Sequence, residues 1–279
     1  MSMKKIRNLF MVMALFGVIM PVWAEKIKGN GKVVTKEIQV AEYESVHMGS
    51  QPNRNGNLFQ SKKKNYKTTL APSFYYTQSD KASLTITTDE NLLPYFEIEV
   101  KSNKLEIAIK EGTTLSPTKL EFNGSSQELH AIEMHSDGYF YLQSALNGQK
   151  LEVSVAGSGE IYLNEPVQLT KCETSVAGDG HVEMKQLTCE KMEVSITGGS
   201  DVELAGKATK QEINIVGSGE VHAFDFLTEA VDFSSVGSGS AEVYASERIE
   251  ASMVGGSLYY KGDPEIESSN VGGKIRHAN

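Results

Sequence analysis

Residues 151–163 read LEVSVAGSGEIYL, and this stretch recurs through the second half of the chain. The copies share two alternating segments around a glycine-containing corner and begin at His130, Cys172, Met192, Gln211, Val231, Ile249 and Ile266. From Gly157 to Gly272, the first glycines of successive corners are 17–21 residues apart. A period of this size is typical of repeat architectures, so the repeat is the main evidence for the fold.

Each repeat unit predicts two short β-strands. Apolar and polar residues alternate, so that Leu151, Val153 and Val155 share one face, as in a strand and not a helix. The glycines that follow fit a tight corner, where the backbone needs a positive φ or room for close approach. Because two short strands cannot bury their apolar face alone, neighbouring units must stack.

Two kinds of stack are possible: a parallel β-helix with one coil per unit, or an antiparallel meander with a hairpin at each glycine corner. Aligned units place acids in one outward column: Glu152, Glu173, Glu193, Glu212, Asp232, Glu250 and Glu267. Bases precede most of them by two residues: Lys150, Lys171, Lys191, Lys210 and Arg248. Polar residues follow two residues later: Ser154, Ser175, Ser195, Asn214, Ser234, Ser252 and Ser269. A parallel stack makes each set a continuous ladder, in which the bases offset repulsion between the acids.

We therefore predict an all-β fold, a single-stranded parallel β-helix of about eight coils over residues 129–279. A less regular, strand-rich head region is expected over residues 25–128. The last unit is polar at the inward positions Ser268 and Asn270, as expected for a terminal cap. The predicted register also separates Cys172 and Cys189 by roughly 10 Å on adjacent coils, so both thiols should be free.

Residues 1–24 resemble a cleaved secretory signal, with a basic start and an apolar stretch from Leu9 to Met20. Removing its three basic residues changes the formal net charge of the chain from −9 to −12. Such an acidic chain argues against a nucleic acid partner. Since no later window is apolar enough for a membrane helix, we expect an exported protein, periplasmic or at the cell surface.

Two sets of residues are candidate binding sites. A second outward column combines carboxylates with imidazole, which suits Ca²⁺ binding or general-base chemistry, and consists of Glu160, His181, Asp201 and Glu220. The loop-like tract 49–80 carries basic and aromatic residues that could bind an anionic glycan, among them Lys62, Lys63, Lys64 and Tyr66. The alternative is a solvated ladder edge for the first set and a solvated loop for the second. No metal, cofactor or catalytic residue is predicted, because the histidines lack zinc spacing and no walled cleft is expected.

Several segments resemble one known family. They are Gly29-Asn30-Gly31, the segment Asp89-Glu90-Asn91-Leu92-Leu93, residues 103–109 and the GSGE and GSGS units. Together they are similar to the auto-transporter adhesin family with a head GIN domain, found in the envelopes of Bacteroidetes. The tract 49–80 looks like an insertion into that pattern. The resemblance implies a right-handed β-helix and an adhesin role.

The sequence thus predicts a non-enzymatic structural or binding protein of the cell envelope. Its partner would be an envelope or host protein or a glycan, and a homo-oligomer is possible because exposed strand edges recruit further strands. The rival hypothesis is a carbohydrate-active β-helix enzyme, a polysaccharide lyase or hydrolase, which would work from the column that begins at Glu160.

Overall fold

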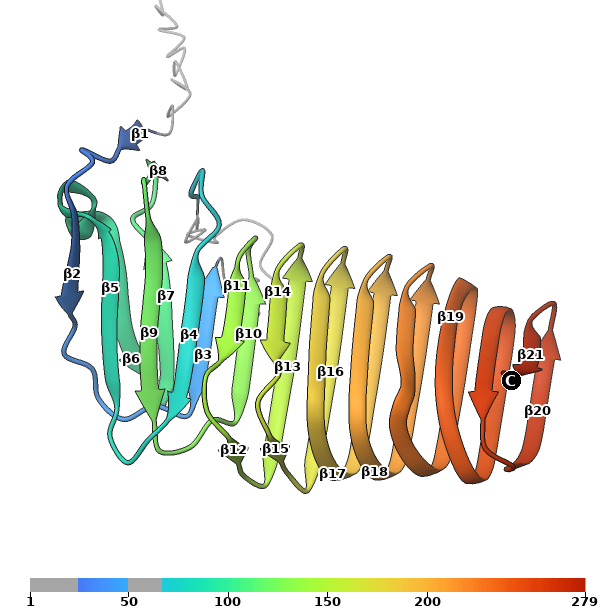
Figure 1. Ribbon diagram of the computed structural model, residues 1–279. Coiled ribbons are helices and arrows are strands. Elements are labelled where there is room, and N and C mark those ends of the chain that lie inside the picture. Colours follow the sequence, from blue (N-terminus) through green and yellow to red (C-terminus); the bar gives the residue numbers. More distant parts are fainter. Residues whose placement is uncertain (1–24, 50–66, 279) are drawn as a thin grey trace, which may run out of the picture.

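The computed structural model describes residues 25–49 and 67–278 and shows an elongated stack of strands (Figure 1). The predicted secretory signal, residues 1–24, lies outside the described residues. So does the predicted binding cluster of Lys62, Lys63, Lys64 and Tyr66. Within the described ranges, no helix is long and apolar enough to cross a membrane.

The second half of the chain forms parallel coils. Its strands are β10 (Ala131–His135), β11 (Tyr139–Leu142), β12 (Leu146–Asn147), β13 (Lys150–Gly157), β14 (Glu160–Leu163), β15 (Val167–Gln168), β16 (Lys171–Gly178), β17 (His181–Gly198), β18 (Asp201–Gly217), β19 (Glu220–Lys261), β20 (Glu265–Val271) and β21 (Lys274–His277). Each coil pairs with the next in the predicted register, so that Glu152 lies beside Glu173 and Glu173 beside Glu193. The prediction of a parallel β-helix is confirmed.

The first half of the chain adds β1 (Glu25–Lys28), β2 (Val33–Glu37), β3 (Ser45–Gly49), β4 (Ser73–Gln78), β5 (Ser83–Asp89), the 3₁₀ helix η1 (Glu90–Tyr95), β6 (Phe96–Lys101), β7 (Lys104–Ile109), β8 (Thr113–Ser116) and β9 (Leu120–Ser126). Strand β3 pairs in parallel with both β7 and β10, and β4 pairs in parallel with both β9 and β11. The coil formed by β3 and β4 therefore lies between two coils that come later in the chain. Parallel stacking runs through both halves of the chain, with a spatial order that differs from the chain order (Figure 1).

Antiparallel strands complete the N-terminal end of the stack. Strand β5 pairs with β2 and β9, and β6 pairs with β7. The Gly29–Gly31 segment folds onto the start of η1: the Gly31 N–H donates to Asp89 Oδ1 at 2.7 Å, and the Asn30 N–H donates to Asn91 Oδ1 at 2.9 Å. Two segments that suggested the family resemblance are thus in direct contact.

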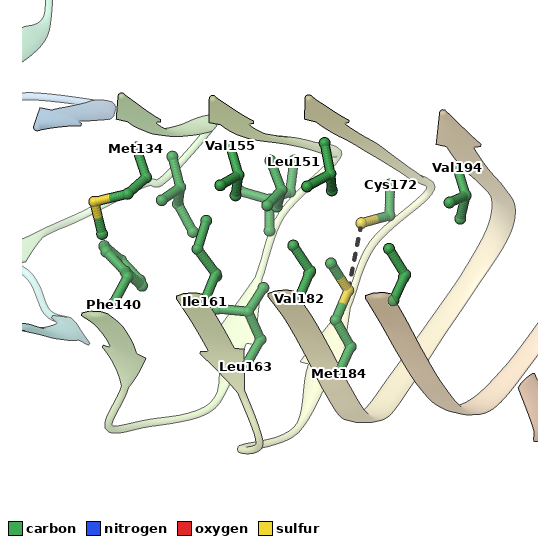
Figure 2. Close-up of a cluster of buried hydrophobic side chains, with 14 of the residues drawn as sticks. Met134, Phe140, Leu151, Val155, Ile161, Leu163, Cys172, Val182, Met184 and Val194 are labelled. Carbon is green, nitrogen blue, oxygen red and sulfur yellow. Dashed lines mark hydrogen bonds between the residues drawn. The ribbon is translucent and has the colours of Figure 1, made fainter. Parts of the chain in front are cut away.

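Inward residues of opposite strands meet inside the stack and form a mainly apolar core (Figure 2), with Thr174, Gln211 and Ser235 as buried polar members. Cys172 lies inside this core and contacts the sulfur of Met184 at 3.9 Å, marked by the dashed line. Both Cys172 and Cys189 are buried free thiols, as predicted. Burial raises the pKa of both, that of Cys189 to about 12.

The first glycine of a corner is required by both conformation and space. Gly198 has φ +120°, and a Cβ there would meet the carbonyl oxygen of Gly178, one coil away, at 2.5 Å. Gly217 repeats this arrangement with φ +123° and a contact of 2.6 Å to the Gly198 oxygen. Corner glycines therefore allow coils to stack at the spacing of a sheet.

The name lysine–glutamate face is used here for the outward side of β3, β10, β13, β16 and β20, of the later parts of β17 and β18, and of residues 230–237 and 248–255 of β19. Lys150 Nζ lies 2.6 Å from Glu152 and 2.8 Å from Glu173. Lys191 likewise bridges Glu193 at 2.6 Å and Glu212 at 2.9 Å. Hydrogen bonds from lysines on two coils lower the pKa values of Glu173 and Glu193. The predicted acids from Glu152 to Glu250 are thus paired with bases of their own or an adjacent coil, as expected from the predicted basic column.

Candidate binding surface

The opposite outward side carries a column of tyrosines. It is formed by β4, β11, β14, the first parts of β17 and β18, and residues 220–226, 240–246 and 257–261 of β19, and is called here the tyrosine face. Tyr75, Tyr141 and Tyr162 occupy equivalent positions on successive coils. Their ring centroids are 5.2 and 5.3 Å apart, with interplanar angles of 16° and 8°. These three stacked, partly exposed rings are the tyrosine ladder, and Tyr139 lies beside it with its ring 6.1 Å from that of Tyr141.

The predicted column of acids and imidazole lies on the same face. Glu160 pairs with His181, His181 with Asp201, and Asp201 with Glu220, so the structure brings all four predicted residues into one row. The His181 ring lies 5.7 Å from the Tyr162 ring. The predicted row is therefore continuous with the tyrosine ladder.

A second acidic row extends the ladder itself. Tyr162 is followed in register by Glu183, Glu203 and His222. His222 Nδ1 then lies 2.9 Å from Glu242 Oε2, and this hydrogen bond raises the pKa of His222. The name acidic strip is used here for the six carboxylates of the two rows: Glu160, Asp201, Glu220, Glu183, Glu203 and Glu242.

Few bases accompany the acidic strip. Asp201 and Glu203 form no ion pair within the described ranges, and Glu220 reaches only His222, at 3.4 Å. Glu160 accepts a hydrogen bond from the Tyr162 hydroxyl; burial and this bond raise the pKa of Tyr162. The strip differs from the lysine–glutamate face, because three of its six carboxylates, Glu160, Asp201 and Glu203, have no basic partner among the described residues.

Glu183 differs from the other acids of the strip in having a lysine partner. It lies 2.9 Å from Lys185 Nζ and accepts a hydrogen bond of 2.6 Å from Asn164. Burial alone would raise the pKa of Glu183, but these two contacts outweigh it and the pKa is lowered. Ligand atoms of His181, Glu183 and Glu203 lie within 4.8 Å of one another, a spacing that a cation could bridge. The lysine and the amide already stabilise Glu183 without one.

A shallow hollow of about 490 Å³ opens beside the strip, lined by Glu203, Ala205, His222, Phe224 and Lys261 among others. It lies at a register shift, where β18 is one residue shorter than its neighbour β19. Ala205 lines the hollow here, whereas Gly206 allows close approach of the coils, because a Cβ there would collide with the carbonyl oxygen of Leu187. Lys261 Nζ lies over the Phe224 ring, 4.5 Å from its centroid. Among the described residues, the strip itself lies on strand surface with short connections between strands (Figure 1).

Sequence reasoning found the Glu160 column but not the tyrosine ladder. Two of its rings were visible in the repeat, because the units from His130 and Leu151 both end in Tyr-Leu. Tyr75 precedes the recognised repeats, and only the pairing of β4 with β11 places it in the row. Periodicity along the chain could not reveal a coil that is inserted out of order.

Fold and surface together define a class, an elongated parallel β-helix with an aromatic and acidic face. The chain belongs to the family described as "Putative auto-transporter adhesin, head GIN domain", whose model matches residues 71–264. The resemblance noted in the sequence is confirmed.

Solved structures of related proteins have the same fold. A "putative lipid binding protein" from Parabacteroides distasonis is 30% identical, with a TM-score of 0.79 over 91% of this chain and all of the other. A "putative adhesin" from the same organism is 28% identical, again with a TM-score of 0.79 over 91% of this chain and all of the other. A "putative adhesin" from Parabacteroides merdae is 26% identical, with a TM-score of 0.81 over 92% of this chain and all of the other. No curated protein matches the sequence.

Proposed function

We propose that this protein is an exported, non-enzymatic adhesin of the bacterial cell envelope, and that the tyrosine face binds its partner, a protein or a glycan. The tyrosine ladder is the observation that carries this proposal. Tyrosine offers a large, rigid and amphipathic contact area at low entropic cost, which is why it is frequent in binding surfaces. Here paired strands hold Tyr75, Tyr141 and Tyr162 in fixed register, so the surface is organised before a partner arrives.

Two further observations support the proposal. The pattern of residues 1–24 is that of an export signal, and two related structures are named as adhesins. The acidic strip is set in an open strand surface, whereas carboxylates that cleave or eliminate polysaccharides converge in a cleft around the sugar. The enzyme hypothesis gains no support from the family or from these relatives.

The binding role is tested with residues 25–279 on a glycan array and in pull-downs from envelope and host-cell extracts. Tyr141→Ala combined with Tyr162→Ala should abolish the interactions that the wild-type chain shows. Tyr95→Ala is the control, because this partly exposed tyrosine lies on η1, outside the tyrosine face. Equal retention of every partner by the ladder variant would refute the role of the tyrosine face.

The non-enzymatic role has its own test. The wild-type chain and the Glu160→Ala, Glu220→Ala double variant are incubated with a panel of envelope and host polysaccharides. We expect no product from either protein. Turnover by the wild type that disappears in the double variant would instead establish the carbohydrate-active enzyme.

A further inference from the structure

The acids on the two outward faces of the stack differ in how many of them have ion-pair partners. On the lysine–glutamate face, lysines bridge acids of adjacent coils at 2.5–3.1 Å in most contacts, as Lys210 does between Glu212 and Asp232. On the tyrosine face, Asp201 and Glu203 have no such partner within the described ranges. Like charges in register destabilise a sheet. The unpaired acids of the acidic strip therefore repel one another, and a cationic partner would reduce this repulsion.

Aromatic rings beside these acids favour the same kind of partner. An ammonium or guanidinium group is attracted to the face of an aromatic ring, and more strongly where carboxylates are near. The tyrosine face already contains one such contact, since Lys261 Nζ lies 4.5 Å from the centroid of the Phe224 ring. The hollow that holds this contact is also lined by Glu203 and Glu242. Lys261 is thus held by an aromatic ring near carboxylates, which is the kind of contact that we assign to the partner's cationic groups.

The shape of the surface indicates an extended ligand. Seven positions follow one another from coil to coil: Tyr75, Tyr141, Tyr162, Glu183, Glu203, His222 and Glu242. At the spacing of adjacent strands this row is about 29 Å long, which equals about nine residues of extended polypeptide. Neutral rings occupy one end and acids the other, so aromatic contacts and charge pairs would act on the same ligand.

We infer that the partner segment is an extended polypeptide rich in lysine or arginine, lying along the stack axis over the tyrosine ladder and the acidic strip. The inference rests on the proposed binding role of the tyrosine face and names its ligand class. Charge complementarity favours such a segment over a neutral glycan, which would use the rings but gain little from unneutralised acids.

The probe is a fluorescent ten-residue peptide of alternating lysine and serine, in which all lysines of an extended chain point the same way. Its binding to residues 25–279 is measured by anisotropy at several salt concentrations. The test variant carries Asp201→Asn, Glu203→Gln and Glu220→Gln. The control carries Glu173→Gln, Glu193→Gln and Glu212→Gln, which removes the same formal charge from the other face. Thermal unfolding confirms that both variants fold.

We expect the wild-type affinity to fall as salt rises and to be about tenfold weaker in the acidic-strip variant, from the loss of three surface charge pairs. The control variant should stay within about twofold. Tyr141→Ala with Tyr162→Ala should also weaken binding. Equal losses in the two charge variants, or no measurable binding at low salt, would overturn the inference, because attraction would then be diffuse or absent.

The same variants separate this inference from the proposed function. A neutral glycan retained by the acidic-strip variant and lost by the tyrosine variant would reject the cationic partner and leave the tyrosine face as the binding surface. Partners of any class that bind all the variants equally well would reject both.

Discussion

At the scale of single residues, the corner glycines set the distance between coils. The backbone at Gly217 has φ +123°, a conformation that residues with a side chain rarely adopt. A Cβ at this position would also collide with the carbonyl oxygen of Gly198 on the adjacent coil. Both penalties act in the folded state alone. Gly148 differs, because no positive φ is involved and the nearest atom to an added Cβ is 3.4 Å away, on the flexible side chain of Leu169.

Gly217→Ala should therefore lower the free energy of unfolding by about 1–3 kcal/mol. Gly148→Ala is the matched control and should change it by less than about 0.5 kcal/mol. Urea denaturation followed by circular dichroism measures both. Equal midpoints for the two variants would show that the corner does not need glycine.

The two cysteines give a second prediction at this scale. Cys172 and Cys189 are buried and their pKa values are raised by burial, so little thiolate forms near neutral pH. Iodoacetamide at pH 8 should label neither residue in the native protein and both after denaturation, as read by mass spectrometry. Rapid labelling of the folded chain, or a disulfide in place of two thiols, would contradict the register of these coils.

At the scale of the element, the polar row on the lysine–glutamate face changes character towards the N-terminal end. The serines give way to Glu133 of β10 and His47 of β3. His47 Nδ1 lies 2.9 Å from Glu133, and Lys104 of β7 pairs with the same carboxylate. The hydrogen bond from His47, then that from Lys104, outweigh burial and lower the pKa of Glu133 to about 2. Three strands that are distant in the chain are joined by one carboxylate.

This carboxylate predicts a pH dependence. A lowered folded-state pKa stabilises the fold above the ordinary value of 4.5, and the contribution is lost as pH falls towards about 2. Glu133→Gln should be less stable than the wild type at pH 6, and the difference should shrink between pH 4.5 and pH 2. Denaturation midpoints across this range measure it. A difference in stability that stays constant with pH would show that ionised Glu133 does not provide this stabilisation.

The contact between the Gly29–Gly31 segment and Asp89 is the other feature at element scale. Asp89 is fully buried and accepts hydrogen bonds from the Gly31 and Thr118 N–H groups, both at 2.7 Å. It joins the chain before β2 to the chain before β9. The carboxylate therefore ties the antiparallel end of the stack together.

Asp89→Asn should cost about 1–3 kcal/mol, since the amide turns an N–H₂ group towards backbone donors. Hydrogen exchange should accelerate in β1 and β2 and stay slow in β16 to β18. Glu90→Gln is the control, because its exposed pair with Lys32 contributes at most about 1 kcal/mol. Uniform acceleration along the whole stack would show that the N-terminal end does not open by itself.

Individual elements also show what the sequence could and could not predict. The acid, base and hydroxyl columns follow from the repeat alone, since a constant period in the sequence becomes a constant position in space. The place of β3 and β4 does not, because their neighbours β7 and β9 come later in the chain and no periodicity records that pairing. The tyrosine ladder depends on this out-of-order coil, so only part of the binding surface could be predicted.

At the scale of the whole molecule, one proposition connects fold and function. Consecutive coils must stack in the same direction and in register, so that like residues form rows along the axis. The tyrosine ladder, the acidic strip and the lysine–glutamate pairs all exist for that reason. A meander of hairpins would put Tyr141 and Tyr162 on unrelated surfaces, and the proposed partner would have no continuous site.

Pulsed electron paramagnetic resonance measures this stacking directly. One spin label is placed at position 154 and the second at 234, 252 or 269, all outward positions of the polar row. With four, five and six coil steps, the Cα separations should rise from about 19 to 24 to 29 Å, at about 4.8 Å for each coil. A regular increase of this size is the result that the account predicts. Distances that alternate, or that do not grow with coil number, would contradict it.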